Sequence, residues 1–262
     1  MHEPSAAPTP CMTFRPGWRF ATGAGVILTA FGLYALASFA HMRIVAGTIG
    51  MEAYLGDGER LPASLLVISQ ASKAGALLFA IWLILARRRE IGWAGLGLRS
   101  VRPGWLAIGA GLGLVFVATG LALVKMMMAA LPAWAAFSGP PFAFGDASSF
   151  AVQAGFLAMT LAVTPFAEEV FFRGFLFRWM TGHHPVWLAA VLSSIMFGAM
   201  HIVPPQAINA AVLSLALIWI FRASGSLWPA VAAHAVNNLA GVMLGAVAAA
   251  GRAPDWLTPP GL

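Results

Sequence analysis

Residues 152–178 read VQAGFLAMTLAVTPFAEEVFFRGFLFR, an apolar stretch of membrane-spanning length with two adjacent acids near its middle. About 20 apolar residues cross the hydrocarbon core of a bilayer as a helix. The whole chain has this character, because 60% of its 262 residues are hydrophobic and only 9% are charged. Soluble proteins carry about 25% charged residues. The composition therefore excludes a water-soluble fold and predicts an all-α, polytopic transmembrane helical bundle.

Seven stretches of this kind follow one another, separated by short polar or proline-containing joints. Long continuous apolar runs favour helices over the alternating strands of a membrane barrel. Lys125–Phe137 could add a crossing, so we expect about seven to eight spans. They form a single transmembrane domain over 21–262, after an N-terminal tail at 1–20. The predicted spans are residues 21–41, 62–86, 105–124, 152–178, 186–203, 206–222 and 227–250.

Basic residues in the joints predict the orientation, because cytoplasmic loops carry an excess of lysine and arginine. If the chain has seven spans, nine lysine and arginine residues of the joints fall on the side of the N-terminus and four fall on the other side. We therefore expect a cytoplasmic N-terminal tail, in a multi-pass protein of the bacterial inner membrane. The net charge of +6 then reflects orientation in a lipid bilayer, and no nucleic-acid partner is expected.

A few polar side chains fall inside the predicted spans, where an ionisable group costs at least about 2.5 to 3.5 kcal/mol to insert. Glu169 and Arg173 are four residues apart, so a helix places them on one face as an ion pair. Glu168 points about 100° away, and we expect it to be a buried, unpaired carboxylate that exchanges a proton near neutral pH. We expect Lys73 to line a wet interior face or to snorkel rather than to act in catalysis.

Three polar side chains on separate predicted spans lie at nearly one depth. Counting the helical rise from the cytoplasmic joints places Glu168 at about 20 Å, His201 at about 24 Å and His234 at about 18 Å. Asn238 follows one turn after His234 on the same helix face, at about 24 Å. A carboxylate, two imidazoles and a carboxamide at a common depth predict one polar site inside the membrane.

These residues resemble the motifs of a known family of membrane proteases. Glu168-Glu169-Val170-Phe171-Phe172-Arg173 resembles the EExxxR motif of the CPBP family, the CAAX proteases and bacteriocin-processing proteases related to the Rce1-type endopeptidase. Phe197-Gly198-Ala199-Met200-His201 resembles its FxxxH motif, and His234-Ala235-Val236-Asn237-Asn238 its HxxxN motif. The motifs occur in the expected order, in a protease-like core at about 150–250.

The resemblance implies an intramembrane endopeptidase that acts on membrane-associated or lipidated peptides and proteins. The implied roles are water activation for Glu168 and His201, oxyanion stabilisation for His234 and Asn238, and a supporting ion pair for Glu169 and Arg173. Amide hydrolysis needs the same parts: a base for water, donors for the developing oxyanion and an acid for the leaving amine.

The sequence is compatible with a metal cofactor and with a metal-free site. Glu168, His201 and His234 form a two-histidine, one-carboxylate set that could bind a divalent metal such as Zn²⁺ and leave a position for water. The helix-borne zinc signature His-Glu-x-x-His is absent from the sequence. Members of the family are commonly labelled metalloproteases, while a metal-free glutamate mechanism has also been proposed for relatives.

Two other functions also stay open. The intramembrane polar residues could form an ion or proton path in a transporter, although the sequence shows no inverted repeat. The chain could instead be a non-catalytic scaffold or bacteriocin-immunity member of the same family.

Glycines lie next to each motif, at Gly174, Gly198 and Gly241. Small residues let membrane helices approach closely. We expect all three to serve this purpose, so that short polar side chains can reach across a crevice.

Overall fold

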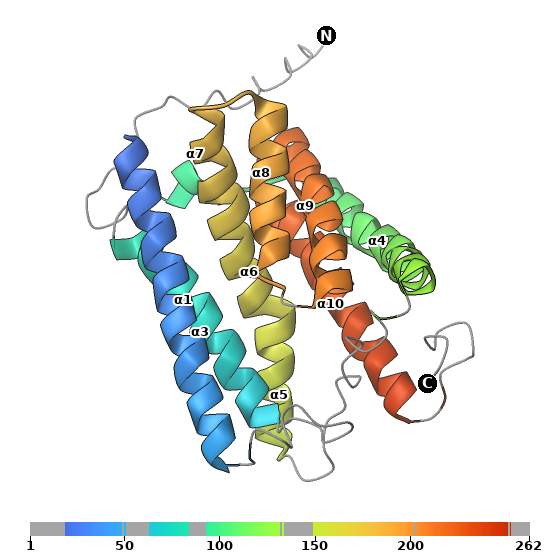
Figure 1. The fold of residues 1–262 in the computed structure, drawn as a ribbon. Helices are drawn as coiled ribbons and strands as arrows, with labels where there is room; N and C mark the ends of the chain where they lie inside the picture. Colours follow the sequence, from blue (N-terminus) through green and yellow to red (C-terminus); the bar gives the residue numbers. More distant parts are fainter. Residues whose placement is uncertain are drawn as a thin grey trace.

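The computed structural model describes residues 19–48, 50, 63–83, 93–131, 133, 149–201, 203–250 and 252, and all regular structure in them is helical (Figure 1). The predicted all-α helical bundle is therefore confirmed. The predicted tail at 1–20 lies outside the described residues except for Arg19 and Phe20. A single domain over 21–262 stays a prediction.

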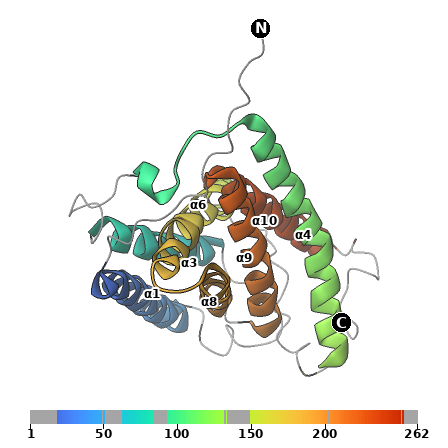
Figure 2. The same cartoon turned by 90° about the horizontal axis from the view of Figure 1, so that it is seen from above.

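One long rod, Phe150–Thr181, runs through the middle of the bundle and is called the central rod below. It joins three α-helical segments, α5, α6 and α7, through two wider π-helical stretches, η4 and η5. Figure 2 shows α1 and α3 on one side of it, α8, α9 and α10 on the other, and α4 outside α10. The elements are α1 (Phe20–Thr48), α3 (Ala63–Ile81), η2 (Trp93–Leu96), α4 (Pro103–Ala130), α5 (Phe150–Ala158), η4 (Met159–Val163), α6 (Thr164–Glu169), η5 (Val170–Phe177), α7 (Arg178–Thr181), α8 (Val186–Ala199), α9 (Pro204–Ser224) and α10 (Trp228–Ala249).

Over the residues that the structure describes, a helix lies within each of the seven predicted spans. Six helical stretches of the described chain are long and apolar enough to cross a membrane. The segment after Lys125 continues α4 as far as Ala130, and the remainder of the possible eighth crossing, 134–137, lies outside the described residues. The six stretches are Phe20–Gly47, Ser64–Ile81, Pro103–Ala130, Phe150–Thr181, Pro204–Ser224 and Trp228–Val247.

The fifth predicted span, 186–203, is the short helix α8, which has 14 residues and ends at Ala199. At 1.5 Å per residue it is about 21 Å long, less than the bilayer core of about 30 Å. Val203, before Pro204, is extended at φ −78° and ψ 117°, because a proline disfavours helical backbone in the residue before it. The chain then turns into α9, so His201 lies in a turn. The prediction that His201 lies inside a helical span is therefore wrong.

Pro165 explains the first wide turn of the central rod. A proline inside a helix has no N–H and its ring crowds the preceding turn. The backbone widens before it into η4, where the N–H of Thr164 donates to the carbonyl of Met159, five residues back. In this register the carbonyl of Thr160 would receive its bond from residue 165, which has no hydrogen to donate. A backbone acceptor is thus left free on the central rod.

The core of the bundle forms around η5, whose eight residues are all buried. Phe171, Phe172 and Phe175 are at most 1% exposed and contact one another edge-on or tilted. Phe172 also contacts Phe197 of α8 edge-on, at 5.0 Å between ring centroids. This aromatic cluster holds the central rod against α8 immediately beside the acidic pair.

Helix α4 contacts α10 through glycines. A Cβ atom at Gly109 or Gly113 would meet the backbone carbonyl oxygens of Pro229 and Ala233 on α10. Backbone atoms cannot move aside as a flexible side chain can. The close approach of α4 therefore depends on these two glycines, and it supports the helix that carries His234.

We expect Gly113→Ala to lower the free energy of unfolding by about 1 to 3 kcal/mol, because the added methyl group overpacks the α4–α10 contact. Gly111→Ala on the same helix is the matched control, since a Cβ there has nothing within 4 Å. Alanine favours a helix by about 1 kcal/mol over glycine, so the control should be neutral or stabilised. Unfolding in mixed micelles would measure both, and equal effects of the two variants would contradict the packing.

Candidate active site

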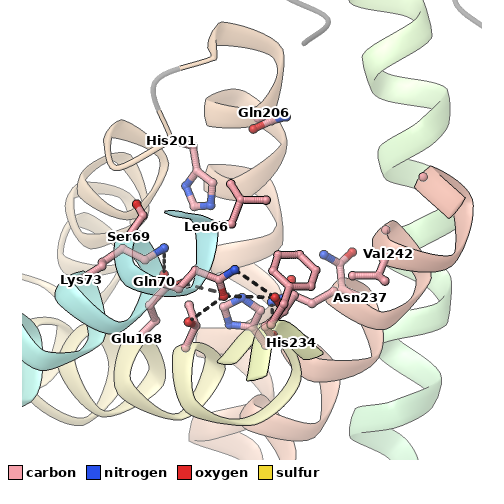
Figure 3. Close-up of a pocket in the computed structure, with 16 residues that line it drawn as sticks. Leu66, Ser69, Gln70, Lys73, Glu168, His201, Gln206, His234, Asn237 and Val242 are labelled. Atoms are coloured by element: carbon pink, nitrogen blue, oxygen red, sulfur yellow. Dashed lines mark hydrogen bonds and ion pairs between the residues drawn. The ribbon is translucent and has the colours of Figure 1, made fainter. Parts of the chain in front are cut away.

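A cavity of about 540 Å³ lies between α3, the central rod and α10, and the α8–α9 turn closes one side (Figure 3). Apolar side chains such as Leu66, Phe156 and Val242 form part of its wall. The other side chains lining it are polar, in a bundle that is otherwise mostly apolar. These polar residues are Ser69, Gln70, Lys73, Thr160, Thr164, Glu168, His201, Gln206, His234, Asn237 and Asn238.

The four residues predicted at a common depth all line this cavity: Glu168, His201, His234 and Asn238. They come from the central rod, the α8–α9 turn and α10, so the fold brings together side chains 70 positions apart in the sequence. The predicted supporting pair, Glu169 and Arg173, does not line the cavity. Its side chains are fully buried in the protein beside it.

Glu168 is 2% exposed, and its carboxylate has a cation beside it. Its Oε1 lies 2.5 Å from Nζ of Lys73 on α3, and its Oε2 lies 3.7 Å from Nε2 of His234. The expectation of an unpaired carboxylate is therefore wrong. Helical spacing shows only partners three or four residues away, whereas Lys73 comes from a helix almost a hundred positions earlier in the chain.

Glu169 holds His234 and Arg173 together. Its Oε1 accepts from Nη1 of Arg173 at 2.8 Å and lies 2.9 Å from Nδ1 of His234. Because an ionised carboxylate only accepts hydrogen bonds, Nδ1 of the imidazole carries the hydrogen of that contact. A hydrogen bond at one ring nitrogen sets the role of the other. Nε2 of His234 is thereby directed at Glu168.

Arg173 is 0% exposed, and its guanidinium lies 4.4 Å from the centroid of the Phe197 ring. Nε and Nη2 of Arg173 and Oε2 of Glu169 have no hydrogen-bond partner in the described part of the chain. A buried ion pair with few further bonds contributes little net stability, but losing one partner is costly. The pair therefore fixes the position of His234 more than it stabilises the bundle.

His201 enters the cavity from the turn after α8. Its Nδ1 lies 3.2 Å from the carbonyl oxygen of Phe197, so Nδ1–H donates and Nε2 stays available. Figure 3 shows the ring on the side of the cavity opposite His234, aimed into the space between them. A turn that leaves the helix at Met200 gives the imidazole this approach.

Asn238 bonds the carbonyl left free by Pro165. Its Nδ2 donates to the backbone oxygen of Thr160 at 3.0 Å. One amide hydrogen is used in this bond, and the second is available to a group in the cavity. The hydroxyls of Thr160 and Thr164 both donate to Oε1 of Gln70, at 3.1 and 3.2 Å, and tie α3 to the central rod.

The predicted metal set does not fit a metal ion. Oε1 of Glu168 is already in contact with the ammonium group of Lys73, which neutralises the charge that a metal cation would need. No cluster of three His, Cys, Asp or Glu side chains suited to a metal occurs among the residues that the structure describes. The side chains of the cavity are therefore the groups available for its chemistry.

Sequence reasoning missed the part that α3 plays. Leu66, Ser69, Gln70 and Lys73 recur at helical spacing and line one wall of the cavity. The three polar residues of this stripe, Ser69, Gln70 and Lys73, were a usable signal in an apolar span, because a lipid-facing surface would not carry them. The expectation that Lys73 lines a wet face is right in its location, but its contact with Glu168 was not foreseen.

Two of the three glycines beside the motifs make close helix contacts as expected. A Cβ at Gly174 would lie 2.7 Å from the carbonyl of Leu96, and one at Gly198 would lie 2.5 Å from that of Ala207. Gly241 is the exception, since nothing lies within 4 Å of such an atom. It lines the cavity instead, where the absent side chain leaves room.

We expect Arg173→Met to lower the free energy of unfolding by about 3 to 5 kcal/mol, because it leaves the Glu169 carboxylate buried without its cation. The double variant Glu169→Gln/Arg173→Met should recover part of this loss, since no unpaired charge remains. Arg102→Met, at an exposed arginine, is the control. Thermal unfolding of the purified variants would test this, and a double variant as unstable as the sum of the two single changes would contradict it.

No curated protein and no solved structure matches the chain significantly. A model of a protein family does match it, over residues 150–240, and its description is type II CAAX prenyl endopeptidase Rce1-like. The matched segment runs from the first residue of α5 into α10 and includes all three motifs. The six apolar helices and this match identify an integral membrane protein with the general character of a membrane endopeptidase. The similarity to the Rce1-like family is thus shown for residues 150–240, the segment that carries all three motifs.

Proposed function

We propose that the protein hydrolyses a peptide bond within the membrane, in a membrane-associated or lipidated peptide or protein. One observation carries the proposal: Glu168, His201, His234 and Asn238 line a single polar cavity in an apolar bundle. The match to a family of prenyl endopeptidases supports the reaction class. The cavity volume of about 540 Å³ is in the range of small-molecule and peptide sites.

The substrate backbone would lie along the carboxamide side chains of the cavity. Gln206 and Asn237 are two of these lining groups. Each carboxamide offers a donor and an acceptor, which matches the donor and acceptor of a peptide unit. The predicted cytoplasmic N-terminus and inner-membrane location belong to the same proposal.

Water would be activated between Glu168 and His201, which face the cavity from opposite sides. Glu168 takes a proton from the water while the oxygen of that water forms a bond to the carbonyl carbon of the substrate. Nε2 of His201 accepts a hydrogen bond from the same water and orients it. General-base catalysis of this kind contributes about 100-fold to 10,000-fold.

The substrate carbonyl oxygen becomes an anion in this step and needs donors. The second amide hydrogen of Asn238 is one of them. His234 can donate from Nε2 only when both ring nitrogens carry hydrogens, and Glu168 and Glu169 supply counter-charges for that form. The carbon–nitrogen bond then breaks, and Glu168 returns its proton to the leaving amine. One water is consumed, and a carboxylate and an amine are released.

We expect Glu168→Gln to lower the rate of peptide cleavage by about 100-fold to 10,000-fold, because the amide cannot take the proton from water. His201→Ala and His234→Ala should each lower it by at least about 100-fold. The matched control is His184→Ala, at an exposed histidine before α8. Mass spectrometry of membrane peptides that stay uncut in the Glu168→Gln strain would identify the substrate, and native cleavage by all three variants would refute the proposed function.

A further inference from the structure

Lys73 is a charged residue of the cavity wall for which the reaction above has no use. Its Nζ lies 2.5 Å from Oε1 of Glu168, and its side chain is 18% exposed. Figure 3 shows its side chain reaching from α3 toward the carboxylate. A lysine that snorkelled would direct its ammonium to the membrane surface, so the contact with Glu168 sets this side chain's direction.

With both imidazoles of the cavity neutral, the charges around Glu168 balance only when this lysine is counted. The central rod contributes two carboxylates and the guanidinium of Arg173, and that guanidinium is bound to Glu169. The other titratable groups facing Glu168 are His201 from the α8–α9 turn and His234 from α10. Neither imidazole has a fixed charge. Lys73 is therefore the permanent cation for Glu168, as Arg173 is for Glu169.

The ammonium also takes the place where a metal cation would contact this carboxylate. In a two-histidine, one-carboxylate metal set, the carboxylate gives its negative charge and at least one oxygen to the ion. Here Oε1 contacts Nζ of Lys73 instead. The lysine thus accounts for the poor fit of Glu168, His201 and His234 to a metal.

We propose that Lys73 is a positioning residue for Glu168: its ammonium balances the charge of the carboxylate, fixes its orientation toward the cavity and excludes a metal ion from it. The importance of Glu168 for cleavage rests on the proposed function, but the pairing does not. Without Lys73, an isolated carboxylate in this apolar setting is expected to keep its proton and therefore cannot accept one from water.

The test compares Lys73→Met, which removes the charge at similar length, with Lys73→Arg, which keeps it. Infrared spectra of the full-length protein in lipid at pH 7 would report the state of Glu168. Lys73→Met should gain the carbonyl band of a protonated carboxylic acid, and Lys73→Met/Glu168→Gln should lose it. Lys73→Arg should resemble the native protein. The chain has one other lysine, Lys125 on α4, so Lys125→Met is the matched control.

Cleavage assays give a second readout. At pH 7, kcat/KM of Lys73→Met should fall by about 10-fold to 1000-fold, because the rate falls in proportion to the fraction of Glu168 that is ionised. It should recover as the pH is raised, because hydroxide then removes the proton from Glu168. A purely structural role for Lys73 would give a loss that does not vary with pH. Arginine at this position should restore most of the activity at pH 7.

The outcomes separate this inference from the proposed function. If Lys73→Met shows no new acid band and cleaves with the native pH profile, Lys73 does not position Glu168, whatever the reaction. If the band appears but the native protein cleaves no peptide, the pairing stands and the proposed function fails. Should Lys73→Met not fold, Lys73→Gln is measured in its place, and a missing band there overturns the inference equally. Zinc bound by the native protein through Glu168 would also overturn it.

Discussion

Two adjacent carboxylates buried in a membrane helix impose the constraint on which this structure depends. Charge is expensive in such a setting unless each group has a partner. One helix can supply a partner for only one of two neighbouring residues, because they point about 100° apart. Arg173, one turn along the same rod, serves Glu169. Glu168 needs a cation from another helix, and this requirement brings α3 against the central rod.

Each of the four side chains proposed to take part in the hydrolysis is held by a partner that does not. Lys73 contacts Glu168, Glu169 contacts His234, the carbonyl of Thr160 binds Asn238, and the carbonyl of Phe197 binds His201. Two of these partners are backbone carbonyls at places where a helix widens or ends. The irregular stretches of the backbone are thus part of how the site is built, in keeping with the frequent occurrence of π-helical turns at functional sites.

Composition and apolar run length were sufficient to predict the helical class and the position of every helix that corresponds to a predicted span. They could not show that α8 ends early, because the effect of Pro204 on the residue before it competes with an apolar run that continues to Val203. Glu168, His201, His234 and Asn238 do line one cavity, although His201 lies beyond the end of α8, where the helical rise used for its depth does not apply. The depth estimate could not find Lys73 as a partner for Glu168, because helical spacing carries no information about which helices become neighbours. The predicted roles of these residues remain predictions.

Pro165 and Asn238 illustrate a dependence that distance along the chain conceals. The proline lacks the hydrogen that would have bonded Thr160, and a carboxamide 73 positions later supplies one instead. A chain with another residue at 165 could bond that carbonyl from its own backbone, and a chain without Asn238 would leave that carbonyl bare toward the cavity. Among relatives, these two positions should therefore change together or not at all.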